Sequence, residues 1–200
     1  MVMKLREVIE AVRSLFSRPP TERFPMAPAN ISERFRGMPQ YYEEDCVGCG
    51  ACAEVCPPGA ITVEDDIEAG KRRLTIDLGR CIFCGQCELN CITEKGIKQT
   101  TEYDMVTFDH TDAKQSVEKD LVFCEETGKV ISTADHVQWV ARKVGALAYA
   151  NPTLLLALQS KLLDRPLVPE EGGKPGMPVK MQVLSPEARR RSVLRDEWSG

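Results

Sequence analysis

Eight of the nine cysteines of this 200-residue chain lie between residues 46 and 91, in two motifs with identical spacing. Each motif reads C-x2-C-x2-C-x3-C, and the second follows the first after 35 residues. The first contains Cys46, Cys49, Cys52 and Cys56, and the second contains Cys81, Cys84, Cys87 and Cys91. Cysteine thiolates are soft ligands that bind iron–sulfur clusters and zinc. The sequence therefore predicts thiolate-bound metal in this part of the chain.

The spacing separates the two kinds of metal centre. Structural zinc sites pair two C-x2-C units, whereas three close cysteines followed by a fourth are typical of a [4Fe–4S] cluster. In chains with two such motifs, the fourth cysteine binds the other cluster. We therefore predict two [4Fe–4S] clusters with these ligands: Cys46, Cys49, Cys52 and Cys91 for the first, and Cys81, Cys84, Cys87 and Cys56 for the second. The alternatives are a structural zinc module and a disulfide scaffold.

The two motifs differ in their neighbours. Pro57 follows the first motif, as the iron–sulfur pattern expects, but Ile92 follows the second. Carboxylates flank the first motif and cations flank the second: Glu43, Glu44, Asp45 and Glu54, against Arg80 and Lys95. Reduction adds negative charge, so nearby carboxylates oppose it. The hypothesis from sequence is that the first cluster has the lower reduction potential.

Short elements must position these loops. Alternating residues predict strands at 60–63 and 74–77, and a third at 97–100. Gly50 and Gly85 follow the second cysteine of each motif and allow close approach of the backbone to a cluster. We expect an α+β fold, with a ferredoxin-like two-cluster domain of short antiparallel strands over residues 43–105.

Flanking segments complete the expected organisation. Apolar residues at helical spacing predict an amphipathic helix over 3–17, followed by a proline-rich extended arm, so that 1–42 form an N-terminal region. The C-terminal extension covers 106–200 and should contact other subunits. It carries predicted helices at about 136–149 (with Asp135 as the N-cap) and 152–163, an extended tail and a short helix from Ser185. Residues 101–133 show no clear pattern.

Outside the two motifs, no residues form a recognisable catalytic centre. The ninth cysteine, Cys124, has no partner cysteine and is interpreted as a structural thiol. His110 and His136 are isolated histidines, interpreted as structural or surface residues. The phosphate-loop and dinucleotide glycine fingerprints are absent.

Composition excludes several classes of protein. Apolar residues make up 42% of the chain, charged residues 28%, and the net charge is −4. These values argue against a disordered chain, a membrane-spanning protein and a basic nucleic-acid binder. The N-terminus interrupts its apolar residues with charges and does not read as a signal peptide. A reducing compartment is therefore expected, where cysteines bind metal more often than they form disulfides.

Four stretches within residues 3–105 resemble one family, the ferredoxin-like two-cluster subunit shared by respiratory complex I and membrane-bound, energy-converting [NiFe] hydrogenases such as formate hydrogenlyase. They read ERFP at 22–25, RFRGMP at 34–39, CVGCGAC at 46–52 and LGRCIFCG at 78–85. The second and fourth are more similar to the hydrogenase branch. Thr127 stands where relatives of that branch can carry cysteine, so a metal site beside Cys124 is not expected.

The resemblance implies an electron-transfer subunit without a catalytic centre of its own. Its two clusters would relay single electrons between an electron-input module or ferredoxin and the small cluster-bearing and large subunits of a hydrogenase. It would lie peripherally on the cytoplasmic side of the cell membrane, in contact with membrane subunits or the membrane surface. The alternatives are the equivalent complex I subunit, which delivers electrons to quinone, and a soluble ferredoxin carrier.

Overall fold

The computed structural model describes residues 5–17, 21, 23–162 and 182–198. The chain divides into two units, Met1–Phe35 and Arg36–Gly200. All nine cysteines belong to the second unit, so the residues expected to bind metal are all in one compact body.

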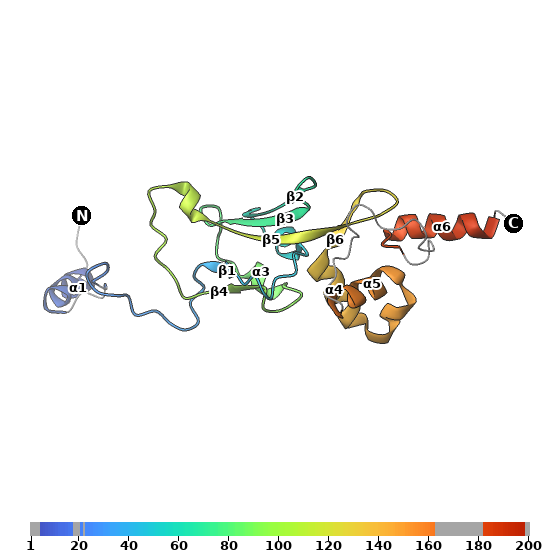
Figure 1. Ribbon diagram of the computed structural model, residues 1–200. Helices are drawn as coiled ribbons and strands as arrows, with labels where there is room; N and C mark the ends of the chain where they lie inside the picture. The colour runs from blue at the N-terminus through green and yellow to red at the C-terminus, as the bar shows by residue number, and fades with distance from the viewer. Residues whose placement is uncertain (1–4, 18–20, 22, 163–181, 199–200) are drawn as a thin grey trace. The chain divides into compact units, whose positions relative to one another are not determined.

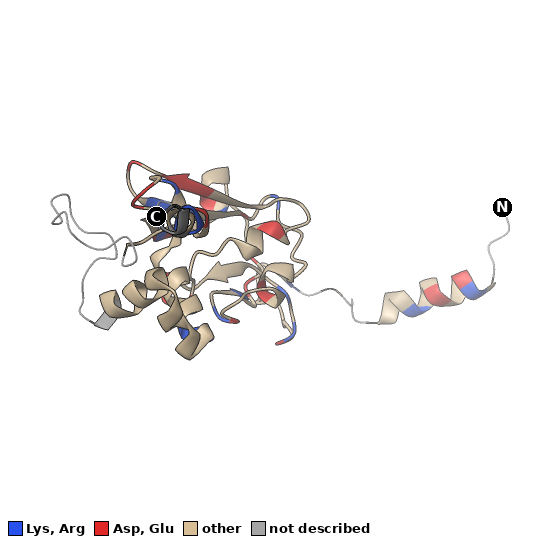
Figure 2. Cartoon of the chain, turned by 90° about the vertical axis from the view of Figure 1, so that its right-hand side faces the viewer, with Lys and Arg blue, Asp and Glu red and all other residues tan. Residues whose placement is uncertain are grey.

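The described part of the first unit contains one helix, α1(Leu5–Phe16), within the predicted range of 3–17. Basic and acidic residues mark its polar side (Figure 2). Six exposed apolar side chains share the other: Leu5, Val8, Ile9, Val12, Leu15 and Phe16. Residues 23–35 of the arm form turns and irregular structure, while Pro19 and Pro20 lie outside the described residues. The apolar face of α1 is therefore exposed.

A four-stranded antiparallel sheet dominates the second unit (Figure 1). β2(Ile61–Asp66) and β3(Lys71–Asp77) form the predicted hairpin, with Ile61 opposite Ile76. β5(Lys114–Phe123) is preceded by the short helix η1(His110–Ala113), and its residues 114–120 pair with the full length of β3. β6(Val130–Thr133) pairs with β5 and completes the order β2-β3-β5-β6. β5 and β6 lie where the sequence predicted no regular element. Residues beyond 105 therefore share a sheet with the β2–β3 hairpin, which lies between the two cysteine motifs.

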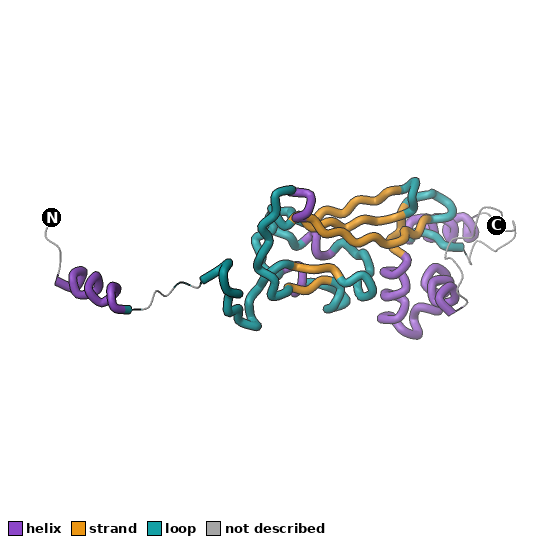
Figure 3. Tube along the Cα trace, turned by 60° about the vertical axis from the view of Figure 1, so that its left-hand side comes forward, coloured by secondary structure: helices purple, strands orange, loops and turns teal. Residues whose placement is uncertain are grey.

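A two-stranded sheet lies below the four-stranded one (Figures 1 and 3). β1(Pro39–Tyr41) pairs antiparallel with β4(Ile97–Gln99), which begins where the third strand was predicted. Two single-turn helices, α2(Ala51–Glu54) and α3(Gln86–Leu89), contain the third cysteine of each motif. The loops that carry the cysteines thus connect two small sheets.

The main core joins both sheets and three of the thiols. Leu74 and Ile76 of β3 are almost completely buried, and each such side chain contributes roughly 1.5–3 kcal/mol to folding. The other members of this core are Ile61, Leu78, Ile97, Val117, Cys46, Cys52 and Cys87. The same hydrophobic core therefore packs the two sheets together and positions these three cysteines.

The first helix of the C-terminal extension differs from the prediction at both ends. α4(Ala134–Val144) starts after Thr133, whose hydroxyl accepts a hydrogen bond from the backbone N–H of His136 at 3.3 Å. Thr133 is therefore the N-cap instead of Asp135. The α-helix ends before Gly145, which adopts φ 63°, and the chain continues as the 3-10 helix η2(Gly145–Ala150). Glycine at this position accepts a positive φ, which other residues rarely adopt and which does not continue an α-helix.

The remaining helices start where the sequence predicted. Asn151 caps α5(Pro152–Leu162) through the N–H of Thr153, and Ser185 caps α6(Pro186–Trp198) through that of Ala188. Most of the predicted extended tail, residues 163–181, lies outside the described residues. The chain that follows packs Leu184 and Ala188 against Cys124 in a second, smaller core.

Candidate metal centres

Two cavities lie in the second unit, and each is lined by four cysteines. The first is a space of about 300 Å³, partly open to solvent, with Cys46, Cys49, Cys52 and Cys91 in its wall. The second is a similar, partly open space of about 330 Å³ with Cys56, Cys81, Cys84 and Cys87 in its wall. Each cavity therefore combines three cysteines of one motif with the last cysteine of the other.

The cysteine loops repeat one backbone conformation. Gly50 and Gly85 are the N-caps of α2 and α3, with φ of 82° and 77°. Such positive φ values favour glycine, which explains its presence in both motifs. The short helices then carry Cys52 and Cys87 inward, where both thiols are buried. After each helix the chain turns and brings the fourth cysteine to the other cavity.

The rest of each wall is mainly apolar. Leu74, Ile92 and Ile97 contribute to the first cavity, and Ile61, Ile76 and Ile82 contribute to the second. Tyr41 and Thr93 add hydroxyl groups to the first wall, and Gln86 and Gln99 add amides to the second. Neither wall contains a carboxylate or a histidine, so thiols are the metal-binding groups that these cavities offer.

Polar hydrogens point at several sulfur atoms. The N–H of Ala60 donates to Cys56 Sγ at 3.2 Å, and that of Phe83 donates to Cys81 Sγ at 3.4 Å. The Thr93 hydroxyl lies 3.3 Å from Cys91 Sγ. Hydrogen bonds of this kind stabilise the negative charge that a thiolate ligand brings to a metal centre.

The thiols must lose protons when they bind metal. Burial raises the pKa of Cys52 to about 12 and that of Cys87 to about 11. Burial also raises the pKa of Cys46 and Cys81. For Cys91, burial acts in the same direction but hydrogen bonds from Thr93 and nearby N–H groups outweigh it, so the pKa is lowered. The four thiols whose pKa is raised hold their protons more strongly than an ordinary cysteine, and metal binding to them releases those protons.

This donor set fits a [4Fe–4S] cluster in each cavity. The thiols surround a space instead of converging on one point. Among the described residues, no three or more Cys, His, Asp or Glu side chains are grouped so that they could hold a metal ion. Four thiolates around a mostly apolar space are what a cubane cluster requires.

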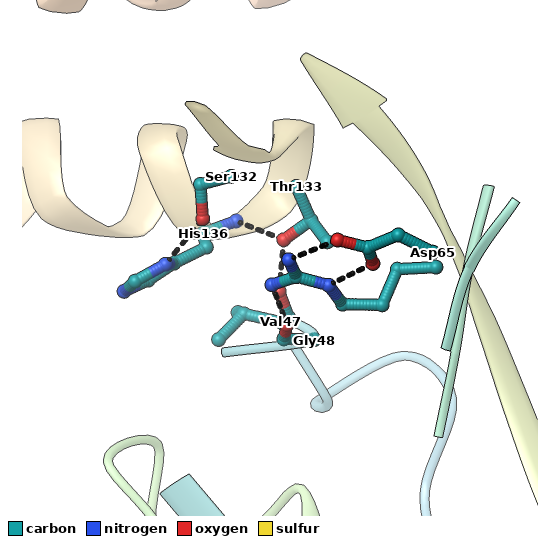
Figure 4. A network of polar contacts seen from close by, with 7 residues as sticks. Val47, Gly48, Asp65, Ser132, Thr133 and His136 are labelled. Carbon is teal, nitrogen blue, oxygen red and sulfur yellow. Dashed lines mark hydrogen bonds and ion pairs between the residues drawn. The ribbon is translucent and has the colours of Figure 1, made fainter. Parts of the chain in front are cut away.

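Residues far away in sequence hold the first cysteine loop. The guanidinium of Arg72 donates to Gly48 O at 3.2 Å, and the hydroxyl of Thr133 donates to Val47 O (Figure 4). The ammonium of Lys119 donates to Glu43 O at 2.6 Å. Sequence reasoning missed all three side chains, because they lie 24, 86 and 76 residues from the groups that they contact.

The second cysteine loop is less covered. The exposed Arg36 donates to Cys84 O at 2.9 Å, and Arg80 donates to Pro58 O at 3.3 Å. Ile82 is 60% exposed, and Leu89 of α3 is 77% exposed. The two halves of the repeat therefore have similar backbones and different surroundings.

Cys124 lies apart from both cavities, in the turn after β5. Its thiol is buried and accepts a hydrogen bond from the N–H of Ser185 at 3.3 Å. Although burial acts to raise the pKa of Cys124, hydrogen bonds from Ser185 and Thr127 lower it to about 7. His110 contacts Asp77 at 3.3 Å, and His136 contacts the Ser132 hydroxyl at 2.7 Å. Neither histidine lines a cavity wall that contains the motif cysteines.

None of the described helices combines the length and the apolar character that crossing a membrane requires.

Comparison with known proteins agrees with this site. The family model for a 4Fe-4S dicluster domain matches residues 45–95. NADH-quinone oxidoreductase subunit I 2 of Geobacter metallireducens is 33% identical over 121 residues, which cover 56% of this chain and 92% of that protein. Formate hydrogenlyase subunit 6 of Escherichia coli is 33% identical over 119 residues, covering 60% of this chain and 66% of that protein.

A third relative is matched over a shorter length. NAD(P)H-quinone oxidoreductase subunit I of Gloeobacter violaceus is 35% identical over 97 residues, and the match spans 46% of each protein. The chain thus spans somewhat less than half of the Gloeobacter protein but nearly all of the Geobacter one. Together with the dicluster domain, the match to the Geobacter protein shows that this chain belongs to the family of iron–sulfur subunits represented by NADH-quinone oxidoreductase subunit I.

Proposed function

We propose that this chain relays single electrons through two [4Fe–4S] clusters as one subunit of a larger redox assembly. The observation that carries the proposal is the pair of four-cysteine cavities joined by one hydrophobic core. Relatives that are subunits of quinone oxidoreductases and of formate hydrogenlyase support it.

The crossed ligand sets are part of this proposal. Cys46, Cys49, Cys52 and Cys91 would hold the first cluster, and Cys81, Cys84, Cys87 and Cys56 would hold the second. Their support is that the same sets line the two cavities. Because each motif contributes to both sites, loss of either cluster would loosen both loops.

When bound, a [4Fe–4S] cluster supplies one-electron redox chemistry. The chain's residues bind it, exclude water and set its electrostatic surroundings. Leu74 and Ile97 form apolar wall on the first cavity, and Ile61 and Ile76 do so on the second. The N–H groups of Ala60 and other residues donate to ligand sulfurs.

For the assembly we propose a membrane-associated [NiFe] hydrogenase of the formate hydrogenlyase type. In it the chain would contact the small cluster-bearing and large subunits and take electrons from an input module or a ferredoxin. A peripheral position on the cytoplasmic side of the membrane follows from that role. The exposed apolar face of α1 supports contact with a partner subunit or the membrane surface. The second candidate is the equivalent subunit of an NADH:quinone oxidoreductase, which the match to the Geobacter relative favours.

Isolation of the native assembly through a tag on this chain tests the proposal. We expect co-purifying subunits, iron and nickel, and hydrogen-dependent reduction of the clusters followed by electron paramagnetic resonance (EPR). Flavin with quinone reduction would instead assign the chain to the quinone oxidoreductase branch. A single-chain species with redox-active clusters would identify a soluble carrier and contradict the proposed assembly.

A further inference from the structure

Two cations from the four-stranded sheet lie against the first cysteine loop. Arg72 on β3 donates to Gly48 O at 3.2 Å and forms a two-pronged ion pair with Asp65, at 2.6 and 2.8 Å (Figure 4). Its side chain is only 16% exposed. The pairing with Asp65 through Nε and Nη2 fixes the guanidinium, so Nη1 is held toward the loop between Cys46 and Cys49.

Lys119 on β5 supplies the second cation. Its ammonium donates to Glu43 O at 2.6 Å and pairs with Asp135 at 2.9 Å, and its side chain is 11% exposed. The contact ties the start of the first motif to β5 and to the first turn of α4. A lysine so little exposed is held in one place by its partners and is weakly screened by solvent.

Packing around Gly48 shows how closely this cover fits. A Cβ atom at Gly48 would lie 2.9 Å from Thr133 Cγ2 and 3.1 Å from Lys119 Cβ. At the equivalent position of the second motif stands Phe83, which has the same left-handed backbone with φ 53°. The second loop therefore tolerates a large side chain where the first tolerates none, because β5, β6 and α4 cover only the first.

The charge arrangement has a consequence for redox chemistry. One-electron reduction of a cluster takes an electron from a one-electron donor and adds one negative charge to the site. A fixed, poorly exposed cation close to that site stabilises the reduced form and raises the reduction potential. The cations beside the second loop, Arg36, Arg80 and Lys95, are all exposed, so solvent screens their charges more strongly.

We propose that Arg72 and Lys119 are positioning residues that hold the loop of Cys46 and Cys49 and raise the reduction potential of the first cluster. This inference rests on the proposed function. The effect of these two cations on the reduction potential opposes that of the carboxylates that flank the first motif in sequence, Glu43 and Asp45 among them.

The test is an anaerobic redox titration of the full chain carrying both clusters, followed by EPR. Arg72→Gln and Lys119→Met should each shift the midpoint potential of the first cluster to more negative values and leave that of the second unchanged. Cys49→Ser, which changes a ligand of the first cluster only, assigns the signals. The matched control is Arg73→Gln, because Arg73 neighbours Arg72 on β3 but pairs with Glu118 at 2.6 Å and is 56% exposed. The control should move neither potential.

Variants that neutralise the carboxylates paired with Arg72 and Lys119 separate an electrostatic role of the two cations from a purely structural one. Asp65→Asn and Asp135→Asn remove the carboxylates that face the two cations, and should shift the first midpoint to more positive values. If Arg72→Gln fails to retain iron, Asp65→Asn and the charge-conserving Arg72→Lys still decide the question.

Three outcomes are distinguishable. Shifts of opposite sign in the cation and carboxylate variants support the inference. Equal midpoints in wild type, Arg72→Gln and Asp65→Asn would overturn it, as would a shift confined to the second cluster. Wild-type protein without two reducible clusters would refute the proposed function itself.

Discussion

At the scale of single residues, the last cysteine of each motif links the two cavities, because it lines the cavity formed by the other motif. Cys56 lines the cavity of the second motif, and Cys91 lines that of the first. The two-motif iron–sulfur pattern predicted that the fourth cysteine of each motif binds the other cluster, and the composition of the two cavity walls supports this prediction.

Cys56→Ala should damage the cluster held by Cys81, Cys84 and Cys87 and spare the other at first. We expect loss of the second cluster's EPR signal and a lower iron content. Cys124→Ala is the control and should leave iron unchanged, since Cys124 lies outside both cavities. The assignment is wrong if Cys56→Ala removes the signal of the first cluster alone.

Gly48 offers a second residue-scale prediction. Gly48→Ala introduces strain at φ +68° and a contact of 2.9 Å with Thr133 Cγ2. Gly128→Ala introduces comparable strain at φ +65°, with no atom within 4 Å of the new Cβ. A left-handed backbone costs a non-glycine residue roughly 1–2 kcal/mol. Anaerobic thermal melting should therefore show a modest loss of thermal stability for Gly128→Ala and a clearly larger loss for Gly48→Ala. Equal losses would mean that the cover over Gly48 is loose.

The sequence was informative about ligands and silent about what holds them. The eight motif cysteines could be proposed as ligands because their spacing is local and specific. Arg72, Lys119 and Thr133 could not, because each acts on a backbone carbonyl at least 24 residues away. Nothing in their immediate neighbours distinguishes them from ordinary surface residues.

At the scale of elements, β5 shows why a strand can escape a periodicity analysis. Its buried residues are Val117, Leu121 and Val122, a spacing that resembles one face of a helix more than the alternation of a strand. An irregularity in the pairing with β6 at Val122 and Phe123 interrupts the alternation. The strand is specified by β3, with Leu74 opposite Val117, and that pairing is invisible locally.

The C-terminal segment is attached by one arginine in particular. Arg189 of α6 donates to Thr153 Oγ1 at 3.1 Å and to Gln182 O at 2.8 Å. Arg189→Met should release this segment, and hydrogen exchange of the Leu184 amide should become faster. Arg190→Met is the matched control, because Arg190 is exposed on the same helix. Similar exchange rates in the two variants would show that the apolar contacts with Cys124 suffice.

At the scale of the whole molecule, the division between the two units predicts which part can hold the clusters. Every candidate ligand lies in Arg36–Gly200, whereas the predicted cluster domain ended near residue 105. Because β5 covers one edge of β3, a chain cut at 105 would expose Leu74 and lose the contacts of Lys119 and Thr133.

A fragment of residues 36–200 should therefore retain both clusters, with about eight iron atoms per chain. A fragment of residues 36–105 should bind less iron or lose it faster to a chelator. Iron and sulfide analysis after anaerobic purification measures both. Equal retention by the two fragments would show that the added strands are dispensable for the metal centres.

The presence of two [4Fe–4S] clusters is best tested by Mössbauer spectroscopy, combined with iron, sulfide and zinc analysis, on the full chain purified without oxygen. About eight irons and eight sulfides per chain are expected, all in [4Fe–4S] clusters, with the eight motif cysteines unavailable to alkylation. Stoichiometric zinc without sulfide, or motif cysteines joined in disulfides, would rule out the two clusters.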